Sequence, residues 1–375
     1  MHSYPRMEID LALSQVMLPP QRADATAAAF TAAADQLIIP DADSLAACRA
    51  AVASLQLDVL IYADIGMDAI SYALGFSRLA AIQATVGHAW PVTTGIRAID
   101  YFVTFEAEAA NAEQHYTERL LRLPGILPYP QPIPAGPSLE HLRRLHDDDQ
   151  PAELVGGSLA ELRAEFGLPV PASRAVVYLC IQAPYKFHPD FDAAVTEILT
   201  AVPGAVFAML RGKARHWTDT LLSRLNQTLG PELMRRVVVL PRTPSSRMPS
   251  LLAAADVVLD TWPYGGGVTS FEALTVGRPL VTLAHRTLPG RFTYAFYLKM
   301  GLLDAVAFTQ SEYVAVAAAL GRSASARAAL SQRIVDRVGV LFDDGTAREA
   351  LETKLQVLLA ELKDPAARAL RLGTA

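Results

Sequence analysis

The feature of this chain that most constrains its fold is the alternation of short, strongly apolar runs with longer stretches of helical spacing. Stretches of helical spacing occur at 191–201, 218–229 and 248–255. Runs that are apolar throughout favour strands buried on both faces. The alternation therefore predicts an α/β fold with open parallel sheets flanked by helices. The runs that predict strands are Asp58–Tyr62, Ala175–Ile181, Ala205–Leu210, Val237–Leu240, Asp256–Asp260 and Leu280–Leu283.

The length and one proline-rich stretch divide the chain. At roughly 100–200 residues per domain, a chain of 375 residues suggests two domains. Pro124–Pro137 holds six prolines in 14 residues, which excludes a helix interior or a central strand. We expect a connection there, and a long surface loop within one domain is the alternative. The predicted parts are a first lobe at 1–125, a linker at 126–172, a second lobe at 173–340 and a C-terminal helix within 341–375.

The predicted C-terminal helix carries leucines at positions 351, 355, 358, 359 and 362, which is a helical spacing. Such a helix either crosses back to the first lobe or packs on the second, and the spacing leaves both arrangements open.

Composition narrows the classes of partner. The chain has 33 basic and 38 acidic side chains, a formal charge of −5, and is 51% hydrophobic, which is typical of a globular protein and argues against nucleic-acid binding. No run of 18 apolar residues predicts a membrane span. Cys48 and Cys180 are too few for a disulfide framework, and the first ten residues lack a secretion pattern. We expect a cytoplasmic protein whose partners include neither nucleic acid nor membrane.

The most informative stretch is 256–283, which reads as strand, glycine-rich turn, helix and strand. Gly265, Gly266 and Gly267 allow a ligand to approach the backbone closely. The helix that follows begins at Val268 and Thr269, and its free N–H groups suit phosphate. The spacing differs from a P-loop and from the dinucleotide fingerprint. A tight turn without a ligand is the alternative.

Three further side chains are candidates. Glu272 lies one turn into that helix, where it could accept hydrogen bonds from ribose. Lys186 follows the run at 175–181 and would lie at the carboxyl end of a parallel strand, where open sheets bind ligands. His88 follows an apolar stretch and could take a proton from a hydroxyl acceptor. A solvated lysine and a structural histidine are the alternatives.

Taken together, several ordered blocks resemble the glycosyltransferase family of the O-linked N-acetylglucosamine transferases and the plant SPINDLY proteins, which has many bacterial members. The likeness covers roughly residues 45–340. The blocks are DIGMD (64–68), GHAWPVTTGIRAIDYF (87–102), EQHYTERLLRLPG (113–125), IQAPYKFHPDFD (181–192), PYGGGVTSFEALTVGRPLVTL (263–283) and RFTYAFYLKMGL (291–302).

The resemblance implies two facing Rossmann-like lobes, the GT-B architecture, and an inverting transferase that uses a nucleotide sugar without a metal ion or other cofactor. It gives Gln182 and Lys186 the diphosphate and assigns His88 to catalysis. The Gly266–Thr269 segment would bind phosphate, Glu272 ribose, and the backbone around Thr243 the base. UDP-linked N-acetylglucosamine is the expected donor, with a GDP-linked sugar as the alternative, and a protein or glycan is the expected acceptor.

The sequence also departs from the family pattern. The family's glycine-histidine-proline is two residues longer here, from Gly87 to Pro91, and Ser245 and Met248 stand where several relatives carry a lysine and a histidine. Nothing in residues 1–45 matches the family's opening strand and histidine turn, so we expect a shortened first lobe. Two rival hypotheses follow: a non-catalytic nucleotide-sugar binder, and an incomplete piece of a longer transferase.

Paired aspartates raise the question of a metal ion. Asp190 and Asp192 lie one residue apart, as in metal-dependent transferases. Because neither follows a strand at a sheet edge, we interpret them as helix caps or solvated residues and predict no metal site.

Overall fold

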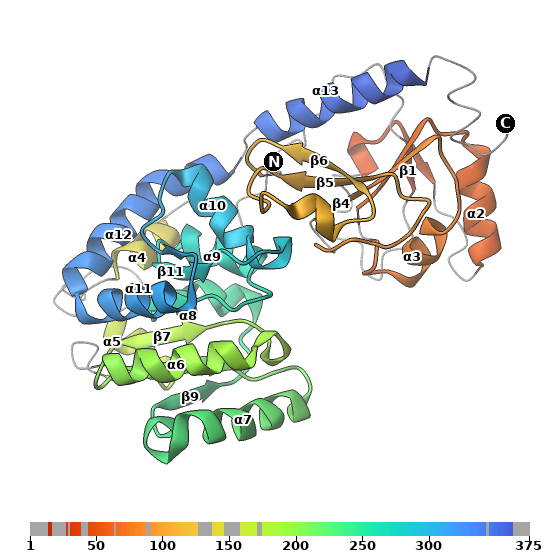
Figure 1. Ribbon diagram of the computed structural model, residues 1–375. Helices are drawn as coiled ribbons and strands as arrows, with labels where there is room; N and C mark the ends of the chain where they lie inside the picture. The colour runs from red at the N-terminus through yellow and green to blue at the C-terminus, as the bar shows by residue number, and fades with distance from the viewer. Residues whose placement is uncertain are drawn as a thin grey trace. The chain divides into compact units, whose positions relative to one another are not determined.

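The computed structural model describes residues 14–16, 28, 31–38, 44–63, 65–87, 91–126, 137–145, 158–170, 175–342 and 345–362 (Figure 1). By its internal contacts the chain divides into two compact units. The first unit comprises 1–106, 110–127 and 345–375, and the second comprises 107–109 and 128–344. Both are built on parallel sheets, as the sequence predicts.

The second unit contains a six-stranded sheet in the order β12-β11-β10-β7-β8-β9, and every pairing in it is parallel. The five strands predicted in this part of the chain form within a residue or two of their expected bounds, and only the short β12 lies outside the predicted runs. The strands are β7 (Val177–Cys180), β8 (Val206–Leu210), β9 (Val237–Leu240), β10 (Val257–Leu259), β11 (Leu280–Leu283) and β12 (Val306–Ala307).

The helices of this unit connect the strands in two opposite directions. From β7 the chain moves outward through α6 and α7 to β9, and from β10 it moves the other way through α9 and α10 to β12. Because such crossovers are right-handed, the two sets of helices cover opposite faces of the sheet. The helices are α4 (Pro137–Arg144), α5 (Leu159–Glu165), α6 (Pro189–Ala201), α7 (Arg215–Met234), α8 (Met248–Ala253), α9 (Val268–Thr275), α10 (Phe292–Met300), α11 (Gln310–Arg322) and α12 (Ala324–Arg337).

This winding places the topological switch point between β7 and β10, where the direction of the strand order reverses. Ligands of doubly wound sheets bind beyond the carboxyl ends of the strands at this point. The loops that follow β7 and β10 are therefore the first place to look for a site.

Two helices from the stretch interpreted as a linker pack on the second unit. Arg143 of α4 donates from Nε to the Thr275 carbonyl at 2.9 Å. Arg163 of α5 is fully buried and forms an ion pair of 2.6 Å with Asp256. Residues 127–136 and 146–157 lie outside the described ones, so the boundaries of the linker stay a prediction.

The first unit contains a four-stranded parallel sheet in the order β3-β4-β5-β6. A separate parallel pair, β1 (Ser14–Val16) and β2 (Gln36–Ile38), lies in the segment that does not match the family's opening strand and histidine turn. The sheet is made of β3 (Val59–Tyr62), β4 (Ile82–Val86), β5 (Tyr101–Phe105) and β6 (Arg119–Leu123), and its described helices are α2 (Leu45–Ser54) and α3 (Ala69–Gly75), with a 3₁₀ turn at Ala112–His115.

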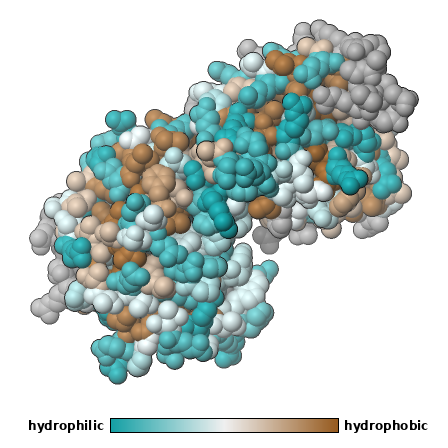
Figure 2. Space-filling model, viewed as in Figure 1, coloured by the Kyte–Doolittle hydropathy of each residue, from teal (hydrophilic) through white to brown (hydrophobic). Residues whose placement is uncertain are grey.

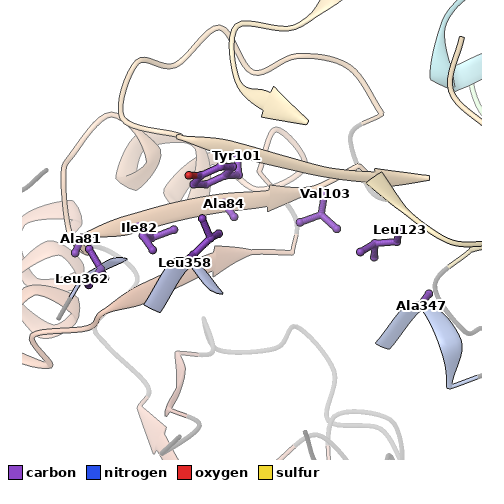
Figure 3. Close-up of a cluster of buried hydrophobic side chains, with 9 residues drawn as sticks. All are labelled: Ala81, Ile82, Ala84, Tyr101, Val103, Leu123, Ala347, Leu358 and Leu362. Atoms are coloured by element: carbon purple, nitrogen blue, oxygen red, sulfur yellow. The ribbon is translucent and has the colours of Figure 1, made fainter. Parts of the chain in front are cut away.

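The C-terminal helix α13 (Thr346–Glu361) packs on this first sheet. Of the two arrangements that its leucine spacing allows, the helix therefore crosses back to the first lobe. Val59 and Ile61 face the α13 side, whereas Leu60 and Tyr62 face the side of α2 and α3, as the alternation of side chains along a strand requires. Figure 3 shows the cluster on the α13 side, formed by Ala81, Ile82, Ala84, Tyr101, Val103, Leu123, Ala347, Leu358 and Leu362.

Hydrophilic and hydrophobic residues are interspersed over the face of the described parts drawn in Figure 2. Among the described helices, none combines the length and the apolar character that a membrane crossing demands.

Candidate functional site

The candidate site lies at the switch point of the second sheet, where the loops after β7 and β10 approach each other. β7 ends at Cys180 and leads to Gln182 and then to a 3₁₀ turn at Pro184–Lys186. β10 leads through the glycine turn to the first residue of α9, Val268. The sequence predicted both loops at this edge, and the parallel pairing of β7 with β10 brings them together.

A chain of hydrogen bonds joins the two loops. Lys186 donates from Nζ to the Gln182 side-chain carbonyl at 2.9 Å and to the Gly265 backbone carbonyl at 2.9 Å. Gln182 in turn donates from Nε2 to the Thr269 hydroxyl at 2.8 Å. Because Gln182 is buried, with 4% of its surface exposed, it fixes both neighbours. Gln182 thus joins Lys186 to the start of α9.

Lys186 carries a positive charge that no carboxylate of the described residues pairs with directly, since none lies within ion-pair distance of its Nζ. Its ammonium lies 4.4 Å from the centre of the Tyr264 ring. Burial lowers the pKa of Lys186, and the negative charge of Asp260 opposes that shift. The amine is therefore partly desolvated and available to an anion.

The glycine turn has an inner and an outer part. The N–H of Gly266 points inward and donates to Asp260 Oδ1 at 2.7 Å. A Cβ on Gly266 would lie 2.4 Å from Ser270 Oγ and 2.5 Å from Gln182 Nε2, so packing alone requires glycine there. A Cβ on Gly267 would meet nothing within 4 Å. Gly267 therefore borders open space, and packing of the described residues does not explain its lack of a side chain.

Three consecutive backbone N–H groups of the turn and of the start of α9 have no acceptor among the described residues. Among the described residues no acceptor bonds to the N–H groups of Gly267, Val268 and Thr269, while the Gly267 carbonyl accepts from Ser270 and Phe271 inside the helix. Free N–H groups at the start of a helix, together with the positive end of its dipole, suit a phosphate. Val268 itself is 55% exposed.

Glu272 lies one turn further into α9 and is half-buried. Burial raises the pKa of its carboxyl group, and no described residue donates a hydrogen bond to that group. A carboxylate that is partly desolvated and has no partner in the protein is suited to accept hydrogen bonds from a ligand.

Asp260 is a buried member of this region that the sequence analysis assigned only to the end of a strand. Its carboxylate accepts from Gly266 N–H, from Thr282 at 3.0 Å and from Thr293 at 2.6 Å. These donors lie 6, 22 and 33 residues along the chain, so no local pattern reveals them. The available signal was an acidic residue directly after an apolar strand that leads into the glycine turn.

Two further residues were predicted for the site, Thr243 and His88. Thr243 follows β9 and donates only to the Pro241 carbonyl, at 3.4 Å, so its contact with a base stays a prediction. His88 lies outside the described residues, and its role in catalysis stays a prediction as well.

The expectation for the aspartate pair is confirmed for Asp190, which is exposed, and is wrong for Asp192. Asp192 is neither a cap nor solvated, because it is fully buried and its Oδ2 lies 2.5 Å from Arg224 Nε. Asp190 accepts nothing at the helix start, where His188 caps the backbone N–H of residue 190 instead. Within the described residues no group of three or more His, Cys, Asp or Glu side chains is arranged to hold a metal ion.

Comparisons with known proteins relate this chain to glycosyltransferases. The sequence model described as Glycosyl transferase family 41 matches residues 148–344. A barley (Hordeum vulgare) protein named a probable UDP-N-acetylglucosamine–peptide N-acetylglucosaminyltransferase SPINDLY is 29% identical over 259 residues, 66% of this chain. A Caenorhabditis elegans protein named UDP-N-acetylglucosamine–peptide N-acetylglucosaminyltransferase is 28% identical over 172 residues, 46% of this chain.

Two solved structures share the fold. A mutant O-GlcNAc transferase of Thermobaculum terrenum covers 96% of this chain with a TM-score of 0.71 at 23% identity, and the match spans 62% of that protein. Anabaena HepE in complex with UDP and glucose covers 89% of this chain, and 90% of its own, with a TM-score of 0.55 at 12% identity. These neighbours are GT-B glycosyltransferases, which confirms the predicted fold class.

The chain is short beside its curated relatives. The match spans 24% of the length of the barley protein and 14% of that of the C. elegans protein.

Proposed function

This chain belongs to glycosyl transferase family 41, and from that premise we propose that it moves a sugar from a nucleotide diphosphate donor to a protein or glycan acceptor. The observation that carries the proposal is the junction of Lys186, Gln182 and Thr269 beside the free N–H groups of α9.

In this proposal the diphosphate lies on the outer side of the glycine turn. The N–H groups of Gly267, Val268 and Thr269 donate to its oxygens, and the Lys186 ammonium balances its charge. Each of these donors is fixed before the ligand arrives, which is the condition under which electrostatic stabilisation is most effective. Glu272 then accepts hydrogen bonds from the ribose, and the backbone around Thr243 contacts the base.

The proposed reaction is one displacement at the anomeric carbon. An acceptor hydroxyl oxygen forms a bond to that carbon while the bond to the diphosphate oxygen breaks. The electron pair of the broken bond remains on the diphosphate, where Lys186 and the helix N–H groups stabilise it. Attack from the opposite face inverts the configuration, and His88 takes the hydroxyl proton. No metal ion or cofactor is part of this proposal.

The donor and the location are finer parts of the proposal. UDP-N-acetylglucosamine is the donor that we propose, because the relatives' names specify it, and a GDP-linked sugar is the alternative. We also propose a cytoplasmic location, in line with Cys48 and Cys180, which are buried and not joined in a disulfide.

Calorimetry with UDP, GDP and their sugar conjugates, run beside an assay for released nucleotide and glycosylated product, tests the proposal. We expect one nucleotide to bind and its sugar to be turned over. Binding without turnover in the presence of acceptor extracts would favour a non-catalytic nucleotide-sugar binder or a piece of a longer transferase. No binding of either nucleotide would overturn the proposal.

A further inference from the structure

Asp260 and Lys186 carry opposite charges at this site and do not contact each other, but both form hydrogen bonds to the glycine turn. Asp260 is 2% exposed and lies directly after β10, beneath the glycine turn. Lys186 contacts the same turn, with its Nζ on the Gly265 carbonyl. The turn is thus in contact with a buried negative charge and a partly buried positive one.

Asp260 is tied to every element that shapes the turn. One carboxylate oxygen accepts from the turn itself, at Gly266 N–H, and the other accepts from Thr282 of β11 and Thr293 of α10. Thr293 also bonds to Ser270 of α9 at 2.7 Å. A Cβ on Gly265 would lie 2.9 Å from Asp260 Oδ2, so the carboxylate also packs against the turn directly.

The backbone carbonyl of Asp260 accepts from the Tyr313 hydroxyl at 2.9 Å, which fixes the residue from the α11 side as well. A carboxylate held in this way keeps the Gly266 amide turned inward. The next three amides, from Gly267 to Thr269, are then left for a ligand.

We propose that Asp260 is a positioning residue of the donor site, which holds the glycine turn in its binding conformation and supplies the counter-charge that keeps Lys186 an ammonium. This inference rests on the proposed function, because Asp260 would set the charge of Lys186 in the same donor site.

The groups that face Lys186 are consistent with that role. Gln182 and the Gly265 carbonyl are neutral acceptors, the Tyr264 ring covers the ammonium, and the Cys180 thiol is buried. Burial raises the pKa of Cys180 to about 12, so this thiol stays neutral at ordinary pH. Burial raises the pKa of the Asp260 carboxyl, while its three hydrogen-bond donors and the charge of Lys186 oppose that shift. In its ionised form Asp260 is the charged group that opposes the desolvation of Lys186.

The test measures the titration of Lys186 without any ligand. The chain has five lysines, at positions 186, 213, 299, 354 and 363, so ¹³C-labelled lysine side chains give few NMR signals, and Lys186→Met assigns the relevant one. We expect the pKa of Lys186 to be lower in Asp260→Asn than in the wild type. The control is Asp304→Asn, which removes an equal charge from an exposed ion pair with Arg333 before β12, and it should leave Lys186 unchanged.

The second arm measures UDP and GDP affinity as a function of pH. Because loss of a hydrogen bond to a charged group typically weakens an equilibrium about tenfold or more, we expect Asp260→Asn to weaken binding about tenfold. As the pH rises, this variant should lose binding at a lower pH than the wild type, because its Lys186 loses its proton earlier. Thr293→Val keeps the charge and loosens the turn. It should weaken binding while the Lys186 titration stays near that of the wild type.

The outcomes separate the two proposals. If neither nucleotide binds the wild type but Lys186 still responds to Asp260→Asn, the proposed function fails and the charge coupling stands. If nucleotide binds and neither the Lys186 titration nor the affinity changes in Asp260→Asn, the role of Asp260 is refuted. Should Asp260→Asn not fold, Lys186→Met provides the reciprocal measurement: the pKa of the Asp260 carboxyl should rise, and an unchanged value would refute the coupling.

Discussion

Gly266 and Gly267 are consecutive residues of one turn, yet an added Cβ would collide with Ser270 and Gln182 at the first and meet only open space at the second. The packing of the described residues therefore explains one glycine and not the other. This contrast makes the pair a direct probe of where a phosphate binds.

Alanine substitution should reduce stability at Gly266 and UDP binding at Gly267. Gly266→Ala overpacks the turn and should lower the free energy of unfolding by about 2 kcal/mol. Gly267→Ala should change it by about 0.5 kcal/mol or less but should weaken UDP binding about tenfold or more, because its Cβ would intrude on a charge-assisted hydrogen bond. Urea unfolding and calorimetry measure the two quantities. A Gly267→Ala protein that binds UDP like the wild type would place the phosphate elsewhere.

Loss of the Lys186 amine should affect the chemical step. Lys186→Ala should cost on the order of 3 kcal/mol in the transition state, a fall of about two orders of magnitude in kcat, because the leaving diphosphate loses its counter-charge. Steady-state kinetics with the identified donor measure this effect. Lys213→Ala, which changes an exposed lysine after β8, is the matched control and should retain the wild-type rate.

Glu272 should show a trade between stability and binding. Burial raises the pKa of this carboxyl in the folded protein above its unfolded value. Folding thus disfavours the charged form of Glu272. The protonated carboxyl stabilises the folded protein at low pH, and this contribution is lost as the pH rises through the folded pKa. Glu272→Gln should therefore leave the protein at least as stable near neutral pH, as thermal unfolding would show.

The same substitution should weaken binding of UDP about tenfold, since hydrogen bonds from ribose to a charged acceptor contribute on the order of 1.5–3 kcal/mol. Wild-type affinity should also fall as the solution is acidified, beginning at a higher pH than an ordinary glutamate would give. Pyrophosphate lacks ribose and is the control ligand. Equal loss of pyrophosphate and UDP affinity in Glu272→Gln would contradict the assignment to ribose.

The C-terminal helix offers a test of the first unit alone. Leu358 is buried in the cluster under α13, whereas its neighbour Val357 is 59% exposed. Leu358→Ala should lower the free energy of unfolding by about 2–4 kcal/mol through lost burial and the cavity left behind. Val357→Ala should change it by about 0.5 kcal/mol or less. Chemical unfolding followed by circular dichroism distinguishes them, and equal effects would contradict the packing of α13 on the first sheet.

The sequence predicted the second sheet well because its strands are apolar throughout. The runs at 237–240 and 280–283 form β9 and β11 with the expected bounds. In the first unit the sequence analysis missed β5 and β6. β5 is buried at all five positions but stood in a block noted only for its family likeness. β6 mixes Arg119 and Arg122 with leucines and is partly exposed, and such a strand carries a weaker signal.

The candidate site divides in the same way. Residues adjacent in sequence to the glycine turn, such as Thr269 and Glu272, could be identified from the local pattern of strand, turn and helix. Asp260 was missed because its three donors come from separate elements that only the folded sheet brings together. The ion pair of Asp192 with Arg224 was missed for the same reason.

A crystal structure of the protein with bound UDP tests the central claim most directly. The account predicts the diphosphate oxygens about 3 Å from the N–H groups of Val268 and Thr269, with the Lys186 ammonium reaching the phosphate that carries the sugar in the intact donor. UDP bound at another edge of the second sheet, with the glycine turn left vacant, would contradict it.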